Sequence, residues 1–352
     1  MSNLPEWLTA SIAPLDKKFL QQAKQHQDQL TKPRGALGQL ETLAINLAAM
    51  QSKLNPQIKK IEICVFAADH GIANSGVSAF PQVVTGEMIR NFVNGGAAIS
   101  VLAKCNQANL SVVDLGTVND IGEMPGVKRK RIASSTKNFL HEPAMSQEHY
   151  AQALDVGRTQ ILDAVNNNAD MFVGGEMGIG NTSSATALAC AILNLPAEQL
   201  VGPGTGLDNN SMQNKADIIQ AALDNHRDNL DSIHDIAQTF GGFEIISLIG
   251  AYLSAAQHKL PVCVDGFISS VAALIACKIN PACKAWLVFS HQSAEPGHAK
   301  VLQALGVQPL LNLSMRLGEG SGAALAIPLL QQACALHNDM ASFADAGVTD
   351  RD

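Results

Sequence analysis

Apolar and polar positions divide the chain into two patterns. Up to about residue 57 the apolar residues are spaced as in helices, and Leu37, Leu40, Leu43 and Leu47 share one helical face. Residues 31–35 contain a Pro and a Gly and separate two helical pieces. This part of the chain is therefore expected to contain helices only.

From residue 61 onwards, short apolar runs alternate with helix-like segments. The runs cover residues 61–67, 110–115, 171–173, 260–264 and 286–289. Near-continuous apolar strands that alternate with helices are typical of a parallel sheet covered on both faces. The sequence therefore predicts an α/β fold whose strands are these runs.

Polar residues follow each of these runs. The segments are 68–71, 114–116, 174–178, 265–267 and 290–293, and each contains a carboxylate or a histidine. Ligands of open α/β sheets bind beyond the carboxyl ends of the strands, so we expect the segments to meet at one edge of the sheet. In the first segment, Asp69 fits either a catalytic pair that orients His70 or a simple cap of the loop.

One carboxylate near the end of the chain has an unusual setting. Glu319 lies between Gly318 and Gly320, just before an apolar, helix-like run at residues 323–330. Glycine lets the backbone approach a ligand closely and allows positive φ angles. Glu319 therefore fits a proton-accepting group in a substrate cleft. The alternative is a surface turn followed by a helix that Ser321 caps.

Two glycine-containing segments fit an anion site. Residues 174–183 precede an alanine-rich helix, and Asn181 and Thr182 add side-chain donors there; the alternative is a turn in which Thr182 or Ser183 caps the helix. Lys215 lies early in a helix, where a cation opposes the helix dipole unless it reaches a bound anion; the alternative is a solvated lysine. The chain has no Walker motif and no clean GxGxxG, which argues against nucleoside triphosphates and dehydrogenase chemistry.

Apolar side chains near the first segment also fit a ligand site. Phe80 and Met88 fit a flat slot for an aromatic ligand, although a core position for Phe80 is the alternative. His291 and His298 are close in sequence, but no regular set of further metal ligands accompanies them. We therefore expect neither a metal site nor any other cofactor.

Composition narrows the class of protein. The chain has 352 residues, of which 47% are hydrophobic, and a formal net charge of -7, which allows a large core and argues against nucleic-acid binding. Its seven cysteines are irregularly spaced without a CxxC pair, so we expect mostly buried, reduced thiols. The apolar runs are too short to span a bilayer, and the first residues lack signal-peptide features. A cytoplasmic protein without a membrane span is expected.

The motifs together resemble one family, the nicotinate-nucleotide:dimethylbenzimidazole phosphoribosyltransferases. The matching segments are residues 32–41, 68–71, 174–182, 241–244, 264–269, 290–295 and 316–324. One segment alone would be a weak match, but the set follows the family's order from about residue 31 to residue 330. The resemblance is therefore specific.

The resemblance implies a Rossmann-like parallel sheet flanked by helices. It divides the chain into a small helical domain, residues 1–57 and 331–352, and a large catalytic α/β domain, residues 58–330. It implies a homodimer that transfers the 5-phosphoribosyl group of nicotinate mononucleotide to 5,6-dimethylbenzimidazole, with inversion at C1′. The products would be α-ribazole 5′-phosphate, used for the lower ligand of cobalamin, and nicotinate.

The resemblance also implies roles for single residues. It makes Glu319 the general base and places Glu176 and Lys215 near the reacting sugar phosphate. The positions that match phosphate and ribose contacts are Gly178, Ser293 and Gly320. The positions that match the walls of a benzimidazole slot are Phe80, Met88, Met177 and Leu317. Other benzimidazoles, purines and phenols stay open as the base that accepts the phosphoribosyl group. A related nucleoside-processing enzyme and a non-catalytic binder stay open as alternative functions.

Overall fold

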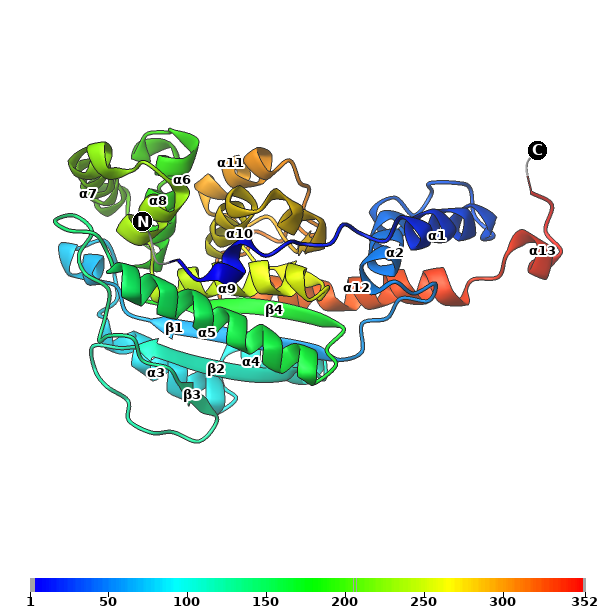
Figure 1. Ribbon diagram of the computed structural model, residues 1–352, viewed down its shortest axis with the longest axis horizontal. Coiled ribbons are helices and arrows are strands. Elements are labelled where there is room, and N and C mark those ends of the chain that lie inside the picture. The colour runs from blue at the N-terminus through cyan, green and yellow to red at the C-terminus, as the bar shows by residue number, and fades with distance from the viewer. Residues whose placement is uncertain (1–3, 205, 207, 351–352) are drawn as a thin grey trace.

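A parallel β-sheet forms the centre of the molecule (Figure 1). The computed structural model describes residues 4–204, 206 and 208–350. The strands in these residues are β1 (Ile61–Ala68), β2 (Asn109–Gly116), β3 (Val127–Arg129), β4 (Met171–Met177), β5 (Val262–Val264) and β6 (Leu287–Phe289). They are all parallel, in the order β3-β2-β1-β4-β5-β6, which is the order of a Rossmann fold. The predicted α/β fold is confirmed.

Strands β4 and β3 differ from the prediction. Residues 174–177 were expected in a loop but form the end of β4, because they pair in register with β1. The edge strand β3 was not predicted, since it is only three residues long and includes Lys128 and Arg129. An edge strand pairs on one side only and can carry charged side chains, so it lacks the apolar pattern of a central strand.

Helices cover both faces of the sheet. The α-helices are α1 (Lys17–Gln29), α2 (Gln39–Gln51), α3 (Val83–Val93), α4 (Ala98–Cys105), α5 (Gln147–Asn166), α6 (Asn181–Leu193), α7 (Asn209–His226), α8 (Ile233–Phe240), α9 (Phe243–Gln257), α10 (Phe267–Ile279), α11 (Pro296–Leu305), α12 (Ser321–Asp339) and α13 (Phe343–Ala346). The short 3-10 helices are η1 (Glu6–Thr9), η2 (Gly71–Ser75), η3 (Ala197–Gln199), η4 (Arg227–Asn229) and η5 (Pro281–Trp286). Helices α5, α9 and α10 lie on one face, and α3, α4 and α12 lie on the other.

Two helices on the first face pack unusually close together. A Cβ atom at Gly157 of α5 would lie 1.8 Å from the carbonyl oxygen of Ser247 in α9. A Cβ atom at Gly250 of α9 would lie 2.1 Å from the carbonyl oxygen of Leu154 in α5. Each glycine therefore lets the backbone of the other helix approach, and the pair of helices can pack tightly over the sheet.

Segments from both chain ends lie side by side at one end of the molecule (Figure 1). Helix α2 packs against α1 and α12, and the backbone N–H of Thr31 donates to the carbonyl oxygen of Ala341 at 3.0 Å. The side-chain amide of Gln27 lies 2.8 Å from Nδ1 of the buried His337. These contacts bring the N-terminal helices and the C-terminal segment into one helical cluster.

The division into two domains stays a prediction. Helix α12 runs without a break from Ser321 to Asp339, so a boundary at residues 330/331 would fall inside one helix. The short helix η1 lies apart from the cluster, since the carbonyl oxygen of Trp7 accepts a 2.8 Å hydrogen bond from Gln257 of α9. A small helical domain would therefore begin near α1 rather than at residue 1.

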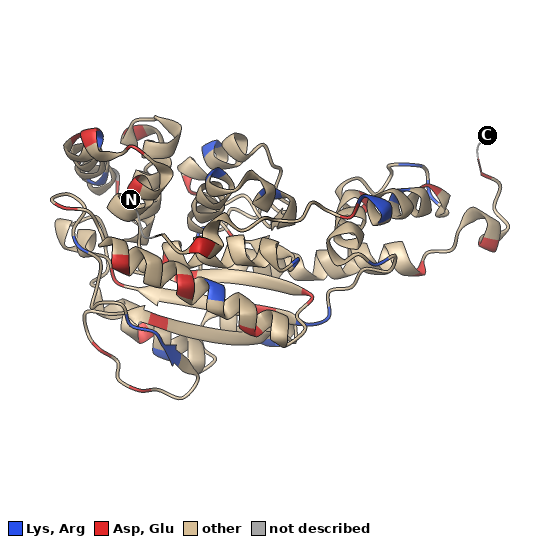
Figure 2. Ribbon diagram, in the orientation of Figure 1, with Lys and Arg blue, Asp and Glu red and all other residues tan. Residues whose placement is uncertain are grey.

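The distribution of charged residues and the burial of the cysteines agree with what the composition predicted. Acidic and basic residues are mixed over the outer helices and the connecting segments (Figure 2). All seven cysteines are free; the five buried ones are Cys64, Cys190, Cys263, Cys283 and Cys334. The expectation that most of them are buried is confirmed. Within the described residues, no helix has both the length and the apolar character that crossing a membrane requires.

We predict that Gly157→Ala lowers the free energy of unfolding by about 1–3 kcal/mol, the usual scale of overpacking. The added methyl group would meet the backbone of α9, which cannot rotate away. Urea unfolding measures the change. Gln152→Ala on the exposed side of α5 is the matched control and should change little; equal stability of the two variants would contradict the close helix contact.

Candidate active site

A cavity of about 480 Å³ lies at the carboxyl edge of the sheet. Its walls come from the end of β4 and the turn after it (Glu176 to Ile179, Asn181, Thr182), the segment after β5 (residues 265–269), the segment after β6 (His291, Ser293, Glu295), residues 316–319 before α12, and Phe80, Val84, Met88 and Gly204. The expected convergence of strand ends is confirmed for β4, β5 and β6. The expected segments after β1 (residues 68–71) and β2 (residues 114–116) do not line the cavity.

A strained loop carries the candidate base. The φ angles of Gly318, Glu319 and Gly320 are 85°, 66° and 88°, so all three residues are in the left-handed region. Such a conformation in a non-glycine residue costs on the order of 1–3 kcal/mol and persists only where the surroundings enforce it. The loop lies directly on β4, because a Cβ atom at Gly175 would be 2.2 Å from the carbonyl oxygen of Glu319.

Asp265 holds this loop at the start of α12. Its Oδ2 accepts the N–H of Gly320 at 3.2 Å, and its Oδ1 accepts the N–H of Ala323 at 2.8 Å. Gly320 is the N-cap of α12, so the alternative in which Ser321 caps the helix is wrong. The hydroxyl of Ser321 instead donates to the carbonyl oxygen of Gly318 at 2.7 Å and tightens the loop.

Glu319 lines the cavity from a buried position. Only 5% of the residue is exposed, and Oε2 lies 3.4 Å from the backbone N–H of Ile99 in the first turn of α4. Burial raises the pKa of Glu319, and the nearby Asp265 charge adds to the rise. Desolvation therefore makes this group more basic, and a more basic carboxylate is better suited to take a proton.

Glu176 is a second buried acid beside this loop. It accepts a short hydrogen bond from the amide of Asn181, and a Cβ atom at Gly318 would lie 2.4 Å from its Oε1. Burial raises the pKa of Glu176 well above its usual value, and the charges of Glu244, Asp265 and Glu319 raise it further. A cationic ring or a sugar with partial positive charge would therefore be stabilised in this part of the cavity.

The start of α6 and the buried Lys215 offer donor and cationic groups beside the cavity. The alternative of a solvated lysine is wrong. Lys215 is 1% exposed, and its Nζ donates to Oγ1 of Thr182 at 2.8 Å. Burial lowers the pKa of Lys215 to about 8, and the charge of Glu295 opposes this shift. Gly180 is the N-cap of α6, so capping by Thr182 or Ser183 is also wrong. A helix N-terminus without a side-chain cap and a buried cation behind it favour a phosphate.

Large apolar side chains line the outer part of the cavity. Phe80 is 51% exposed and Leu317 is 56% exposed, so the alternative that places Phe80 in the core is wrong. Met88 of α3 and Met177 at the end of β4 are partly buried, pack against the hydrophobic core and line the cavity. Exposed apolar groups in a concave site fit a flat aromatic ligand, as the sequence predicted.

Comparison with known proteins identifies the family. A family model described as "Phosphoribosyltransferase" matches residues 12–348. The nicotinate-nucleotide–dimethylbenzimidazole phosphoribosyltransferase of Pseudomonas putida (strain W619) is 53% identical over 347 residues, 99% of each chain. The protein of the same name from Pseudomonas aeruginosa (strain PAO1) is 52% identical over 346 residues, 98% of this chain and 99% of that one.

Solved structures agree with the sequence comparison. A crystal structure of nicotinate-nucleotide-dimethylbenzimidazole phosphoribosyltransferase from Thermus thermophilus superposes with a TM-score of 0.90 at 39% identity, over 96% of this chain and 100% of that chain. The chain belongs to the nicotinate-nucleotide–dimethylbenzimidazole phosphoribosyltransferase family. The solved relative has the fold that the resemblance implied, and this chain shares it.

Most of the predicted site residues meet in the cavity of this family member. Those that line it are Glu319, Glu176, Phe80, Met88, Met177, Gly178, Asn181, Thr182, Ser293 and Leu317. Lys215 lies behind Thr182, and the N–H of Gly320 is already bonded to Asp265, so neither residue forms the cavity wall. The roles of all these residues stay predictions.

The sequence missed several groups and left one pair open between two interpretations. Asp265 and Arg316 were in the matched segments but received no role; the position of Asp265 after a strand was the available signal. Asp69 does not orient His70, because its Oδ2 accepts the N–H of Val118 at 2.8 Å. His70 instead pairs with Glu244, which is distant in sequence.

The two histidines considered for a metal site have other partners. Nδ1 of His298 accepts the N–H of Ser293 at 2.7 Å, and its Nε2 lies 2.9 Å from the hydroxyl oxygen of Ser270. Nε2 of His291 lies 3.6 Å from Oδ1 of Asp265. In the part of the chain that the structure describes, no group of three or more possible ligands could hold a metal ion.

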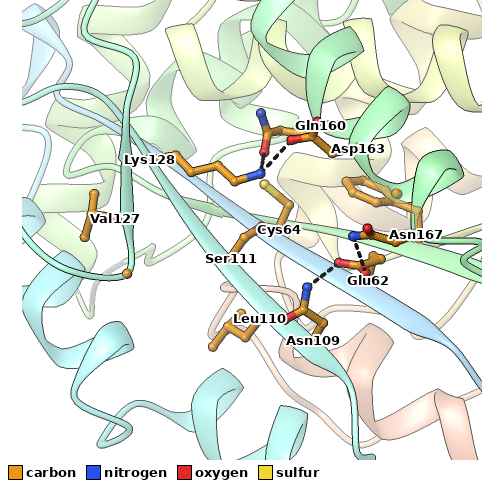
Figure 3. A pocket seen from close by; sticks show the side chains of 13 residues that line it. Glu62, Cys64, Asn109, Leu110, Ser111, Val127, Lys128, Gln160, Asp163 and Asn167 are labelled. Atoms are coloured by element: carbon orange, nitrogen blue, oxygen red, sulfur yellow. Dashed lines mark hydrogen bonds and ion pairs between the residues drawn. The ribbon is translucent and has the colours of Figure 1, made fainter.

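A second cavity of about 360 Å³ lies near the amino ends of β1, β2 and β3, beside α5 (Figure 3). Its polar groups already bond to one another. Lys128 donates to Gln160 at 2.7 Å and to Asp163 at 2.8 Å, and Glu62 accepts from two asparagine amides. Since this pairing leaves few groups to bind a ligand, the cavity at the carboxyl edge is the better candidate.

We predict that Glu176→Gln stabilises the free protein by about 1 kcal/mol at neutral pH, the scale typical of relieving a costly active-site group. The pKa of Glu176 is raised above 4.5 in the folded state, so its ionisation opposes folding. The wild type therefore loses stability relative to the variant as pH rises from about 4.5 through the folded-state pKa. Thermal unfolding at several pH values measures this.

The exposed Glu198→Gln is the control for that experiment, because it removes a carboxylate without relieving burial. The stability difference between this variant and the wild type should not grow as pH rises. A Glu176→Gln variant that is less stable than the wild type at neutral pH would contradict the assignment of a costly, buried acid.

Proposed function

We propose that this family member transfers the 5-phosphoribosyl group of nicotinate mononucleotide to 5,6-dimethylbenzimidazole or a related base. The products are α-ribazole 5′-phosphate and nicotinate, and the reaction serves the assembly of the lower ligand of cobalamin. The observation that carries the proposal is the position of Glu319, a buried acid that lines a cavity with an apolar mouth. The names of the relatives support the choice of substrates.

In the proposed reaction, one benzimidazole nitrogen attacks C1′ of the ribose from the α face. The bond from C1′ to the pyridine nitrogen breaks, nicotinate leaves from the β face, and the configuration at C1′ inverts. Glu319 takes the proton from the second nitrogen of the attacking ring. The proton therefore passes from the base to this carboxylate, and the bonding electrons of the broken bond leave with nicotinate.

The charges around the cavity suit this substrate. The pyridinium ring of nicotinate mononucleotide carries a positive charge, and the ribose gains partial positive charge as the ring leaves. The carboxyl group of Glu176 can stabilise that charge. Lys215, with the N-terminus of α6, is placed to balance the phosphate.

Positioning is the larger contribution in this mechanism. A well-placed general base typically supplies ~10²–10⁴-fold in rate. Holding two reactants in line can supply roughly 7–11 kcal/mol, which corresponds to a larger factor. The apolar mouth around Phe80 and Leu317 would hold the attacking ring in line while the phosphate contacts hold the sugar.

A homodimer and a cytoplasmic location are also part of the proposal. The homodimer rests on the family resemblance, and sedimentation would measure it. The seven free thiols support a reducing compartment such as the cytoplasm.

Incubation with nicotinate mononucleotide and a panel of benzimidazoles, purines and phenols, followed by mass analysis of the products, tests the function. We expect the wild type to form a ribosyl phosphate of a benzimidazole and to release nicotinate. In the same assay, Glu319→Gln should lower turnover by about a hundredfold or more, because glutamine cannot accept the proton. Nicotinate mononucleotide should still bind to this variant.

Two outcomes would contradict the proposal. If the wild type bound the nucleotide without turning over any base of the panel, the protein would be a binder rather than a transferase. If Glu319→Gln retained nearly wild-type turnover, this carboxylate would not be the base. Glu198→Gln, an exposed carboxylate outside the cavity, is the control and should keep full activity.

We predict that Lys215→Ala weakens binding of nicotinate mononucleotide by roughly 10- to 100-fold, the scale of a lost charged hydrogen bond. Because the pKa of Lys215 is lowered to about 8, wild-type affinity should fall as pH rises past that value. This pH dependence should be absent in the variant. Calorimetry over the pH range measures both effects.

Lys300→Ala is the control for charge alone, since this lysine is exposed on α11. It should leave the affinity and its pH dependence unchanged. Wild-type affinity in Lys215→Ala would show that this cation does not contribute to phosphate binding.

A further inference from the structure

Two sequence motifs without a role in the proposed mechanism meet beneath the cavity. His70, directly after β1, and Glu244, in the first turn of α9, are 174 positions apart, yet Nε2 of His70 lies 2.6 Å from Oε1 of Glu244. Both side chains have no exposed surface. Burying an ionisable pair is costly unless good geometry and hydrogen bonds compensate for the lost hydration.

The imidazole ring of His70 lies against the backbone of the turn that follows β4. A Cβ atom at Gly178 would be 3.1 Å from both Cδ2 and Nε2 of the ring, and a Cβ atom at Gly180 would be 3.3 Å from Cβ of His70. On another side, a Cβ atom at Gly242 would be 2.1 Å from Cε1. Glycines therefore enclose the ring, and its position determines where the turn at residues 178–180 can lie.

The same residue is connected to the apolar wall. The carbonyl oxygen of His70 accepts a 2.8 Å hydrogen bond from the side-chain amide of Gln82, which immediately precedes α3. Helix α3 carries Met88 of the cavity wall and also Thr85, whose Oγ1 accepts the N–H of Ile179 at 3.1 Å. His70 is thus in contact with the turn at residues 178–180, and through Gln82 it is connected to helix α3, which carries Met88 of the apolar wall.

Hydrogen bonding indicates which atoms the pair shares. Nδ1 of His70 has no hydrogen-bond partner among the described residues, so a proton there would be buried without an acceptor. The arrangement that avoids this has Nε2 of His70 donating to Oε1 of Glu244. Oε2 of Glu244 also has no hydrogen-bond partner among the described residues, so no hydrogen bond offsets the charge of Glu244 there.

That charge acts on Glu176. After burial, the charge of Glu244 is the largest cause of the raised pKa of Glu176, ahead of Asp265 and Glu319. Asp69 also faces the pair; burial raises the pKa of Asp69, and the charge of Glu244 raises it further while His70 lowers it. Removing the charge of Glu244 would leave Asp265 and Glu319 as the acids that act on Glu176.

We propose that His70 and Glu244 form a positioning pair, which fixes the turn at residues 178–180 and sets the negative charge that Glu176 faces during phosphoribosyl transfer. Neither residue reaches the cavity, so the pair acts through the turn and through Glu176. This inference rests on the transferase function proposed above, because its effect is measured in that reaction.

Glu244→Gln tests the pair, since glutamine keeps the size and the hydrogen bond but removes the charge. We expect kcat to fall roughly 10- to 100-fold, with a smaller change in KM, as for a misplaced reacting group. The acidic limb of the pH profile of kcat, in which Glu176 must be ionised, should move to lower pH because a like charge is lost. Steady-state kinetics between about pH 5 and about pH 9 measure both.

Glu244→Asp is the matched variant, because it keeps the charge but withdraws the carboxylate by one methylene group. It should lower kcat and leave the acidic limb near its wild-type position. His226→Asn controls for loss of a buried polar contact elsewhere, since His226 bonds to the carbonyl oxygen of Phe139 at 2.9 Å outside the cavity. It should lower thermal stability without moving the limb.

The outcomes separate this inference from the proposed function. If the wild type forms product and Glu244→Gln keeps both its kcat and its acidic limb, the positioning pair is refuted. Should Glu244→Gln not fold, an unchanged kcat in Glu244→Asp refutes it equally. If the wild type forms no product with any base, the transferase function fails, and the inference fails with it.

Discussion

The contact between the loop at residues 318–320 and the end of β4 is the constraint on which the rest of the site depends. Three successive residues in the left-handed region would not hold this shape alone. Gly175 lets the loop lie on the strand, and Asp265 fixes it by accepting two backbone N–H groups. The candidate base therefore sits on a rigid sheet edge, as a precise catalytic geometry requires.

This arrangement brings several acids together at a cost to the free protein. Burial raises the pKa values of Glu176, Asp265, Glu295 and Glu319, so the charged form of each carries a desolvation cost. A positively charged substrate would relieve that cost on binding. Under the proposed function, the site would gain affinity for a cationic nucleotide from interactions that destabilise the protein without it, a common trade between stability and activity.

The resemblance and the strand pattern predicted much of the fold and the site. Five apolar runs are strands of the sheet, and the residues after β4, β5 and β6 meet in one cavity. Edge strand β3 was missed because short, charged edge strands have no apolar signature. Phe80 was left between core and slot, since a single aromatic residue has the same sequence signal in either place, and only its exposure decided.

The sequence by itself determined the α/β class, the edge of the sheet at which the candidate site lies and the candidate base, because apolar periodicity and glycine placement are local properties of the chain. Only the tertiary structure decided which side chains act together. His70 has Asp69 as its neighbour in sequence but pairs with Glu244, and Lys215 is buried against Thr182 rather than solvated. Packing between elements that are distant in sequence determines such partners, and the residues next to each side chain in the sequence do not reveal them.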